Sequence, residues 1–201
     1  MEQRDDIVRL AIQEASRLPV NLWNDLRCQL ETDELVRLLI TPGMLELLAI
    51  HEAGHEIYYL RAGCRILGFE SPRIIYSKQN ENPFFQQRTR TLLGSQFQPQ
   101  GDDWLLELAR GYAAGGRCSI RLTTTDYAGD TIDRKLFNEM YISCHPDEIV
   151  DIRDIDKMWS DAQKDVNKDL DDECFQAQVR ARAREIMPQL FPWLDAQHNR
   201  P

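Results

Sequence analysis

The chain has 201 residues, of which 42% are hydrophobic, enough to bury one substantial core. Acidic residues outnumber basic ones by 33 to 24, and the formal net charge of −9 argues against nucleic acid as a partner, because phosphate binding needs clustered Lys and Arg. The sequence contains neither a run of roughly eighteen apolar residues nor a basic, apolar leader, so we expect a cytoplasmic protein without a membrane span.

Residues 1–40 predict an N-terminal helical segment. Apolar residues recur there at spacings of three and four, which is typical of short amphipathic helices. A longer helix is then predicted from about residue 42 to 62, because Thr41-Pro42 supplies a hydroxyl cap followed by proline at the first helical position. Gly63 is a natural cap for its C-terminal end.

The region after Gly63 predicts β-structure and then a long loop. Residues 66–69 and 73–76 are rich in β-prone side chains and are separated by Ser71-Pro72, which indicates a strand pair or a bent edge strand. Residues 77–101 are rich in Gln, Asn and Pro and predict a loop, with room for one further strand around 89–93. A loop of this length is usually functional, and we expect it to gate a cleft.

The rest of the chain predicts helices: one over residues 102–122, one from Asp130 onward, and two within 150–195. The Met and aromatic residues of the last two recur at helical spacing and indicate scaffold core. The predicted fold class is therefore α+β and mainly α-helical, with a small β-sheet or hairpin beside the helix at 42–62. Residues 41–145 form the central region, and residues 146–201 form a C-terminal helical segment packed on it in a single compact domain.

Residues 51–55 read His-Glu-Ala-Gly-His and carry the clearest chemical signal in the chain. Positions i and i+4 of a helix share one face, so His51 and His55 can bind the same metal ion. Glu52 then lies beside that ion, where a carboxylate can act as general base toward a metal-activated water and later as general acid toward the leaving amine. The pattern predicts Zn²⁺ as the cofactor and peptide-bond hydrolysis as the reaction.

Catalytic zinc needs a third protein ligand, and the two familiar extensions of the motif do not supply one. Arg61 stands six residues after His55, where a third histidine would be, and Glu70, the first carboxylate after the motif helix, falls in a predicted strand or turn. Helical periodicity places Asp133 on an inward face, since apolar residues follow it at +3, +4, +7 and +8. Asp130 lacks that pattern and can equally be a helix cap.

Three motifs in order resemble the peptidase domain of the FtsH-type AAA+ zinc proteases over about residues 44–145: the pentapeptide at 51–55, Gly115-Gly116-Arg117, and Thr124-Thr125 followed by Asp130. In that family the last motif reads Thr-Thr-Gly-Ala-x-Asn-Asp, and its final Asp is the third ligand. The resemblance therefore implies a zincin-like fold with Asp130 as third ligand. Asp133 is the alternate ligand and Asp126 a third, weaker one.

The chain departs from the family in several places. Asp126-Tyr127 stands where the family has Gly-Ala, and Gly129 stands where it has Asn. Ile120 stands where the family has a Glu directly after the Gly-Gly-Arg motif and its pair of small residues. No Walker A sequence occurs either, so the ATP-driven motor of the family is not expected.

The resemblance thus implies an ATP-independent zinc peptidase that acts on flexible or unfolded polypeptides. The alternative is a catalytically inactive, peptidase-like binding or regulatory module. The sequence leaves the oligomeric state open, a homo-oligomer included.

Overall fold

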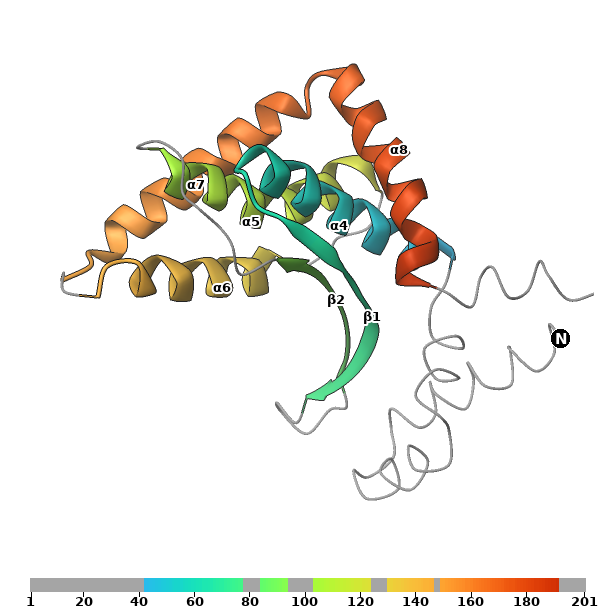
Figure 1. The fold of residues 1–201 in the computed structure, drawn as a ribbon, viewed down its shortest axis with the longest axis horizontal. Coiled ribbons are helices and arrows are strands. Elements are labelled where there is room, and N and C mark those ends of the chain that lie inside the picture. Colours follow the sequence, from blue (N-terminus) through green and yellow to red (C-terminus); the bar gives the residue numbers. More distant parts are fainter. Residues whose placement is uncertain (1–41, 78–83, 94–102, 124–129, 147–148, 192–201) are drawn as a thin grey trace, which may run out of the picture.

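The computed structural model describes residues 42–77, 84–93, 103–123, 130–146 and 149–191 (Figure 1). Within these ranges it describes the backbone alone for 42–44, 70–77, 84–93 and Asp130. The described part is mainly helical, with five helices and one two-stranded antiparallel sheet. The predicted N-terminal helical segment, residues 1–40, lies outside the described residues. Among the described residues, no helix is both long enough and apolar enough to cross a membrane.

Helix α4, Pro42–Arg61, carries the pentapeptide and lies at the centre of the fold (Figure 1). Every residue from 47 to 59 is buried, so this helix is covered on all sides. It ends as predicted: Gly63 adopts a φ of 80°, and the backbone N–H of Cys64 donates to the carbonyl of Tyr59. Together with the Gly63-to-Leu60 bond, this is a Schellman cap, which needs a left-handed residue at the position that Gly63 occupies.

Strand β1, Ile66–Ser77, pairs with strand β2, Phe84–Leu93, in an antiparallel hairpin that contacts α4. The prediction of a bent edge strand is confirmed, because β1 is continuous but its register shifts between Glu70 and Arg73, next to Pro72, which lacks a backbone donor. The further strand allowed for around 89–93 is present as part of β2, but this strand begins at Phe84, so the prediction of a loop is wrong for residues 84–88. A two-stranded sheet leaves much of its surface open, so the polar composition of this segment is compatible with a strand.

Helix α5, Trp104–Leu122, packs along α4, and α6, Asp130–Ser143, packs on α5. Helices α7, Ile152–Asp169, and α8, Glu173–Leu190, follow. Both begin at a capping aspartate, Asp151 and Asp172, whose side chain accepts a backbone N–H two residues later. These four helices confirm the predicted helical regions.

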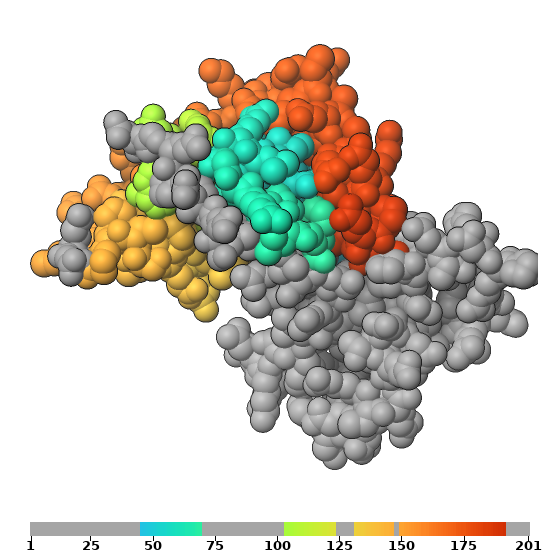
Figure 2. All heavy atoms as spheres, in the orientation of Figure 1, coloured from blue at the N-terminus to red at the C-terminus, as the bar shows by residue number. Residues whose placement is uncertain are grey.

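The C-terminal helices share a hydrophobic core with α4 rather than forming a unit of their own. Val166 from α7, Leu170 at its C-terminal cap, and a row of residues from Phe175 to Phe191 in and after α8 pack against the apolar residues of α4. Figure 2 shows the surface of α8 lying directly against that of α4 and the start of β1. A second cluster, around Phe137 and Trp159, joins α5, α6 and α7. The helix that carries the pentapeptide is therefore held from several sides.

Candidate metal centre

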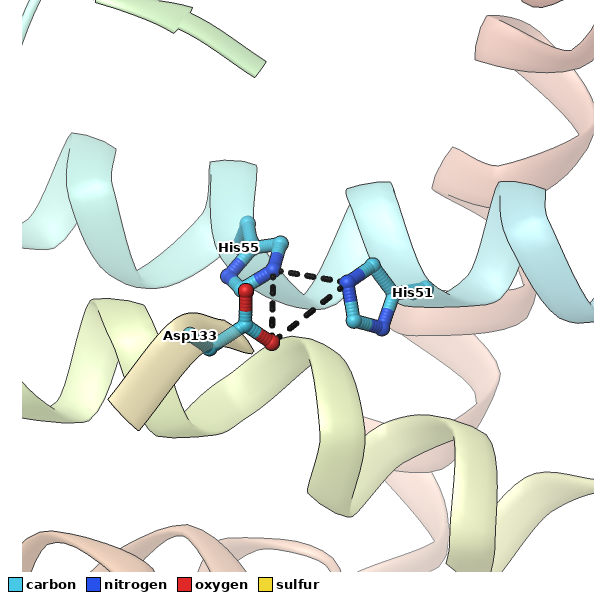
Figure 3. Close-up of side chains that lie close together, drawn as sticks. All are labelled: His51, His55 and Asp133. Atoms are coloured by element: carbon cyan, nitrogen blue, oxygen red, sulfur yellow. Dashed lines mark hydrogen bonds and ion pairs between the residues drawn. The ribbon is translucent and has the colours of Figure 1, made fainter. Parts of the chain in front are cut away.

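One face of α4 and the first turn of α6 bring two imidazoles and a carboxylate together (Figure 3). The Nε2 atoms of His51 and His55 lie 2.9 Å apart, and each lies 3.6 Å from Oδ2 of Asp133. All three residues are buried, with 5%, 5% and 9% of their surface exposed, respectively. Three potential ligand atoms thus face one point in a site largely shielded from water.

Helix α5 contacts the other nitrogen of each imidazole. Nδ1–H of His55 donates to the carbonyl of Gly111 at 2.7 Å, and Nδ1 of His51 lies 3.5 Å from the hydroxyl oxygen of the fully buried Ser119. A carbonyl only accepts, so Nδ1 of His55 carries the hydrogen and the lone pair of this ring lies on Nε2, the atom that faces Asp133. The Ser119 hydroxyl can accept from Nδ1 of His51 in the same way. The ring of His55 is further held by stacking on Tyr59, with centroids 5.7 Å apart and planes 12° from parallel.

Glycine residues allow α5 to approach the histidines this closely. A Cβ atom at Gly115 would lie 2.3 Å from Nε2 of His55, and one at Gly111 would lie 2.4 Å from two ring carbons of Tyr59. On the facing helix, a Cβ atom at Gly54 would lie 2.9 Å from the carbonyl oxygen of Ala114. None of these separations can accommodate a side chain without movement of the backbone or of a buried ring. Gly115 therefore forms the floor of the site.

The electrostatics of the site favour a proton on His55 when no metal is present. Burial lowers the pKa of His55, but the neighbouring Asp133 carboxylate, the charge of Glu52 and the Gly111 carbonyl outweigh burial and raise that pKa to about 9. A cation is thus stabilised at the point where the three side chains meet. A bound metal ion would take the place of this proton.

The separations of the three atoms suit a metal ion. A tetrahedral ion with nitrogen and oxygen ligands at about 2.0–2.1 Å holds those ligand atoms about 3.3–3.4 Å apart. The observed separations of 2.9, 3.6 and 3.6 Å lie on both sides of that value. The donor set, two imidazoles and one carboxylate, is also one that such ions accept. The buried group of His51, His55 and Asp133 could therefore hold a metal ion.

Glu52 follows His51 on α4 and is 1% exposed. Its charge contributes to the raised pKa of His55, which shows that the carboxylate lies within electrostatic range of the site. Buried carboxylates are rare unless they have a partner or a function, and the neighbours of Glu52 on α4 are the two histidines of this group. An acid–base group thus accompanies the potential ligands.

The structure brings together three of the predicted site residues, His51, Glu52 and His55, on α4. For the third ligand it brings Asp133 to the histidines, as the helical periodicity predicted. Asp130, chosen on the resemblance, is the first residue of α6, and its side chain lies outside the described residues, as does all of Asp126. Asp133 lies about one helical turn beyond Asp130.

The sequence did not reveal the contacts of Gly111 and Ser119 with the imidazoles, because nothing in their spacing indicates which helix they face. The departure at Ile120 is easier to place. This side chain is 44% exposed, whereas Ser119 beside it is fully buried and contacts His51. The position where the family has a Glu thus points away from the imidazoles in this chain.

The site is defined by its geometry alone, as a buried group of two histidines on α4 and one aspartate on α6. No protein-family model, no curated protein and no solved structure matches the chain.

Proposed function

We propose that this chain is a zinc-dependent, ATP-independent peptidase that hydrolyses peptide bonds in flexible or unfolded polypeptides. The observation that carries the proposal is the buried convergence of His51, His55 and Asp133 beside Glu52. Structural zinc sites are usually closed by four protein ligands, whereas a catalytic site has three and keeps a position for water or substrate. Among the residues that the structure describes, the group has three members, the number typical of the second kind.

Zinc suits this donor set, because it accepts imidazole nitrogen and carboxylate oxygen in one tetrahedral site. When bound, it supplies a Lewis acid that makes water nucleophilic at neutral pH. His51 and His55 offer Nε2 as neutral ligands, each with its other nitrogen turned toward α5. Asp133 supplies the negative charge that offsets part of the charge of the cation.

Glu52 is the proposed general base and acid. Its carboxylate would take a proton from the attacking water and pass it to the nitrogen of the leaving amine, as the equivalent residue does in other HExxH peptidases. Burial keeps bulk water away from this carboxylate. Glu56, one turn further along α4, is excluded from this role, because Arg182 binds both of its carboxylate oxygens.

The hairpin of β1 and β2 is the proposed place for the substrate backbone. Both strands of a two-stranded sheet are edge strands, and an extended peptide can pair with such an edge through main-chain hydrogen bonds. This mode of binding needs a substrate segment that is already extended. It therefore favours flexible polypeptides over folded ones.

The test compares two buried glutamates of the same helix, Glu52 and Glu56. Glu52→Gln should retain zinc and lower kcat for an unfolded casein substrate by roughly 10²–10⁴-fold, the usual range for loss of a general base. Glu56→Gln, the matched control, should retain both zinc and turnover. Wild-type cleavage should stop with a chelator and return with zinc. Unchanged cleavage by Glu52→Gln contradicts the proposed mechanism.

The exposure of the site favours one alternative, an inactive binding or regulatory module. None of the three potential ligands exceeds 9% exposure, so a substrate would need an opening to reach them. A module of this kind would bind zinc without chelator-sensitive turnover. The same metal analysis and cleavage assay therefore separate the two functions.

A further inference from the structure

We infer that Ser119 is a positioning residue for the metal centre, which holds His51 in the orientation and tautomer that present Nε2 to the metal. This inference rests on the metal site of the proposed function and adds to it a residue that contacts neither metal nor substrate. Ser119 lies on α5, which packs against the histidines but contributes no ligand to the group of His51, His55 and Asp133.

The two imidazoles are arranged in parallel ways. Each turns Nε2 toward Asp133 and Nδ1 toward α5. Because α4 and α5 run in opposite directions here, the later histidine, His55, meets the earlier α5 residue, Gly111, and the earlier histidine, His51, meets the later one, Ser119. One helix therefore provides an oxygen for both Nδ1 atoms.

The two oxygens differ in kind. The oxygen that faces His55 is the backbone carbonyl of Gly111, which no substitution removes. The oxygen that faces His51 belongs to the side chain of Ser119 and exists only because that residue carries a hydroxyl. A hydrogen-bond acceptor beside Nδ1 favours the Nδ1–H tautomer and thereby keeps the lone pair on Nε2, the outer interaction typical of metal-binding histidines.

The burial of Ser119 supports a specific role. Its exposure is 0%, and a hydroxyl in an apolar helix interface is costly unless it is hydrogen-bonded. Its neighbour Cys118 is equally buried but packs toward Gly54, to whose Cβ position its sulfur is 2.9 Å away. Alanine substitutions at these two adjacent positions can therefore be compared. Each removes one buried side-chain atom, but only Ser119→Ala removes the oxygen that faces His51.

The experiment measures the zinc affinity of the full chain by competition with a chromophoric chelator for wild type, Ser119→Ala and Cys118→Ala. Ser119→Ala should bind zinc about tenfold or more weakly, the lower end of the range for loss of an outer-sphere partner. Cys118→Ala should stay within about threefold of wild type. NMR of the zinc-loaded protein should show a slowly exchanging Nδ1 proton on His51 in wild type and Cys118→Ala, and rapid exchange of that proton in Ser119→Ala.

Three results decide the outcome. Weaker binding and faster exchange confined to Ser119→Ala support the inference. Equal affinity and equal exchange in all three proteins overturn it and leave the metal site and the proposed function intact. Failure of wild type to bind zinc overturns the metal site itself, and the inference with it. Should Ser119→Ala fail to fold, Ser119→Cys, which keeps the shape of the side chain but has a larger sulfur that accepts only weakly, must show the same loss of affinity.

Discussion

Replacement of Asp133 by Asn should weaken zinc binding by an amount that grows with pH. In the metal-free protein burial lowers the pKa of His55, but the carboxylate of Asp133, together with the charge of Glu52 and the Gly111 carbonyl, outweighs burial and raises that pKa to about 9; Asp133 is the largest of the causes that raise it. At about pH 7.5 wild-type His55 therefore carries a proton that zinc must displace. The amide of an Asn at position 133 has no charge, so burial then dominates and lowers the pKa of His55.

The magnitude follows from the pKa. A pKa about 1.5 units above the working pH costs the wild-type protein about 2 kcal/mol, or ~30-fold in zinc affinity, at about pH 7.5. At about pH 9 the same proton costs only about twofold. In Asp133→Asn zinc displaces no proton from His55 in this pH range, but the variant lacks the carboxylate ligand at every pH. Its deficit relative to wild type should therefore widen by about 15-fold between these two pH values.

The assay is a zinc titration against a competing chelator at several pH values, with the affinity of the chelator corrected for its own protonation. Asp130→Asn is the matched control, because the same exchange is made about one turn earlier on α6. Its zinc affinity should follow that of wild type at every pH. A deficit of Asp133→Asn that stays constant with pH would refute the coupling to His55, and a larger deficit in Asp130→Asn would make Asp130 the ligand.

Two further predictions concern the packing around the site. Gly115→Ala places a methyl group 2.3 Å from Nε2 of His55. The resulting overpacking, partly offset by the helix preference of Ala, should destabilise the fold by about 1–2 kcal/mol in urea unfolding. Chelator competition should show that high-affinity zinc binding is lost. Arg182→Ala leaves the 3%-exposed carboxylate of Glu56 without its guanidinium partner and should lower the free energy of unfolding by about 2–4 kcal/mol. Glu56→Gln leaves a half-buried Arg182 that still binds Glu185, so it should lower the free energy of unfolding by only about 1–2 kcal/mol. Equal costs in urea unfolding would contradict this asymmetry.

The residues on α4 could be predicted from the sequence because their relation is local. A separation of four residues places His51 and His55 on one helical face whatever the rest of the fold does, and Glu52 follows with them. The ends of α4 were equally predictable, since proline at the first helical position, Pro42, and the Gly63 cap act within one turn of chain. These features need no knowledge of any other element.

The third ligand could not be decided from local rules alone. Asp130 and Asp133 both lie in the first turn of α6, and motif and periodicity favoured different residues. The described structure supports the periodicity, because the inward face of α6 also carries the fully buried Phe137, one turn beyond Asp133. Strand β2 was difficult for a related reason: its pairing partner is up to 27 residues away, at Ile66 opposite Leu93, and its own composition is that of a loop.

The contacts of α5 with the histidines depend on tertiary packing, and they give the glycines of this helix a physical reason. Gly111 and Gly115 lie one turn apart, and each faces a ring of α4 that would collide with a side chain. Only a helix free of Cβ atoms at both positions can bring its backbone carbonyl to His55. The same close approach places Ser119, two turns beyond Gly111, at His51. The glycines and the serine thus act together, and a change at Gly115 should disturb both imidazoles, whereas a change at Ser119 should disturb one.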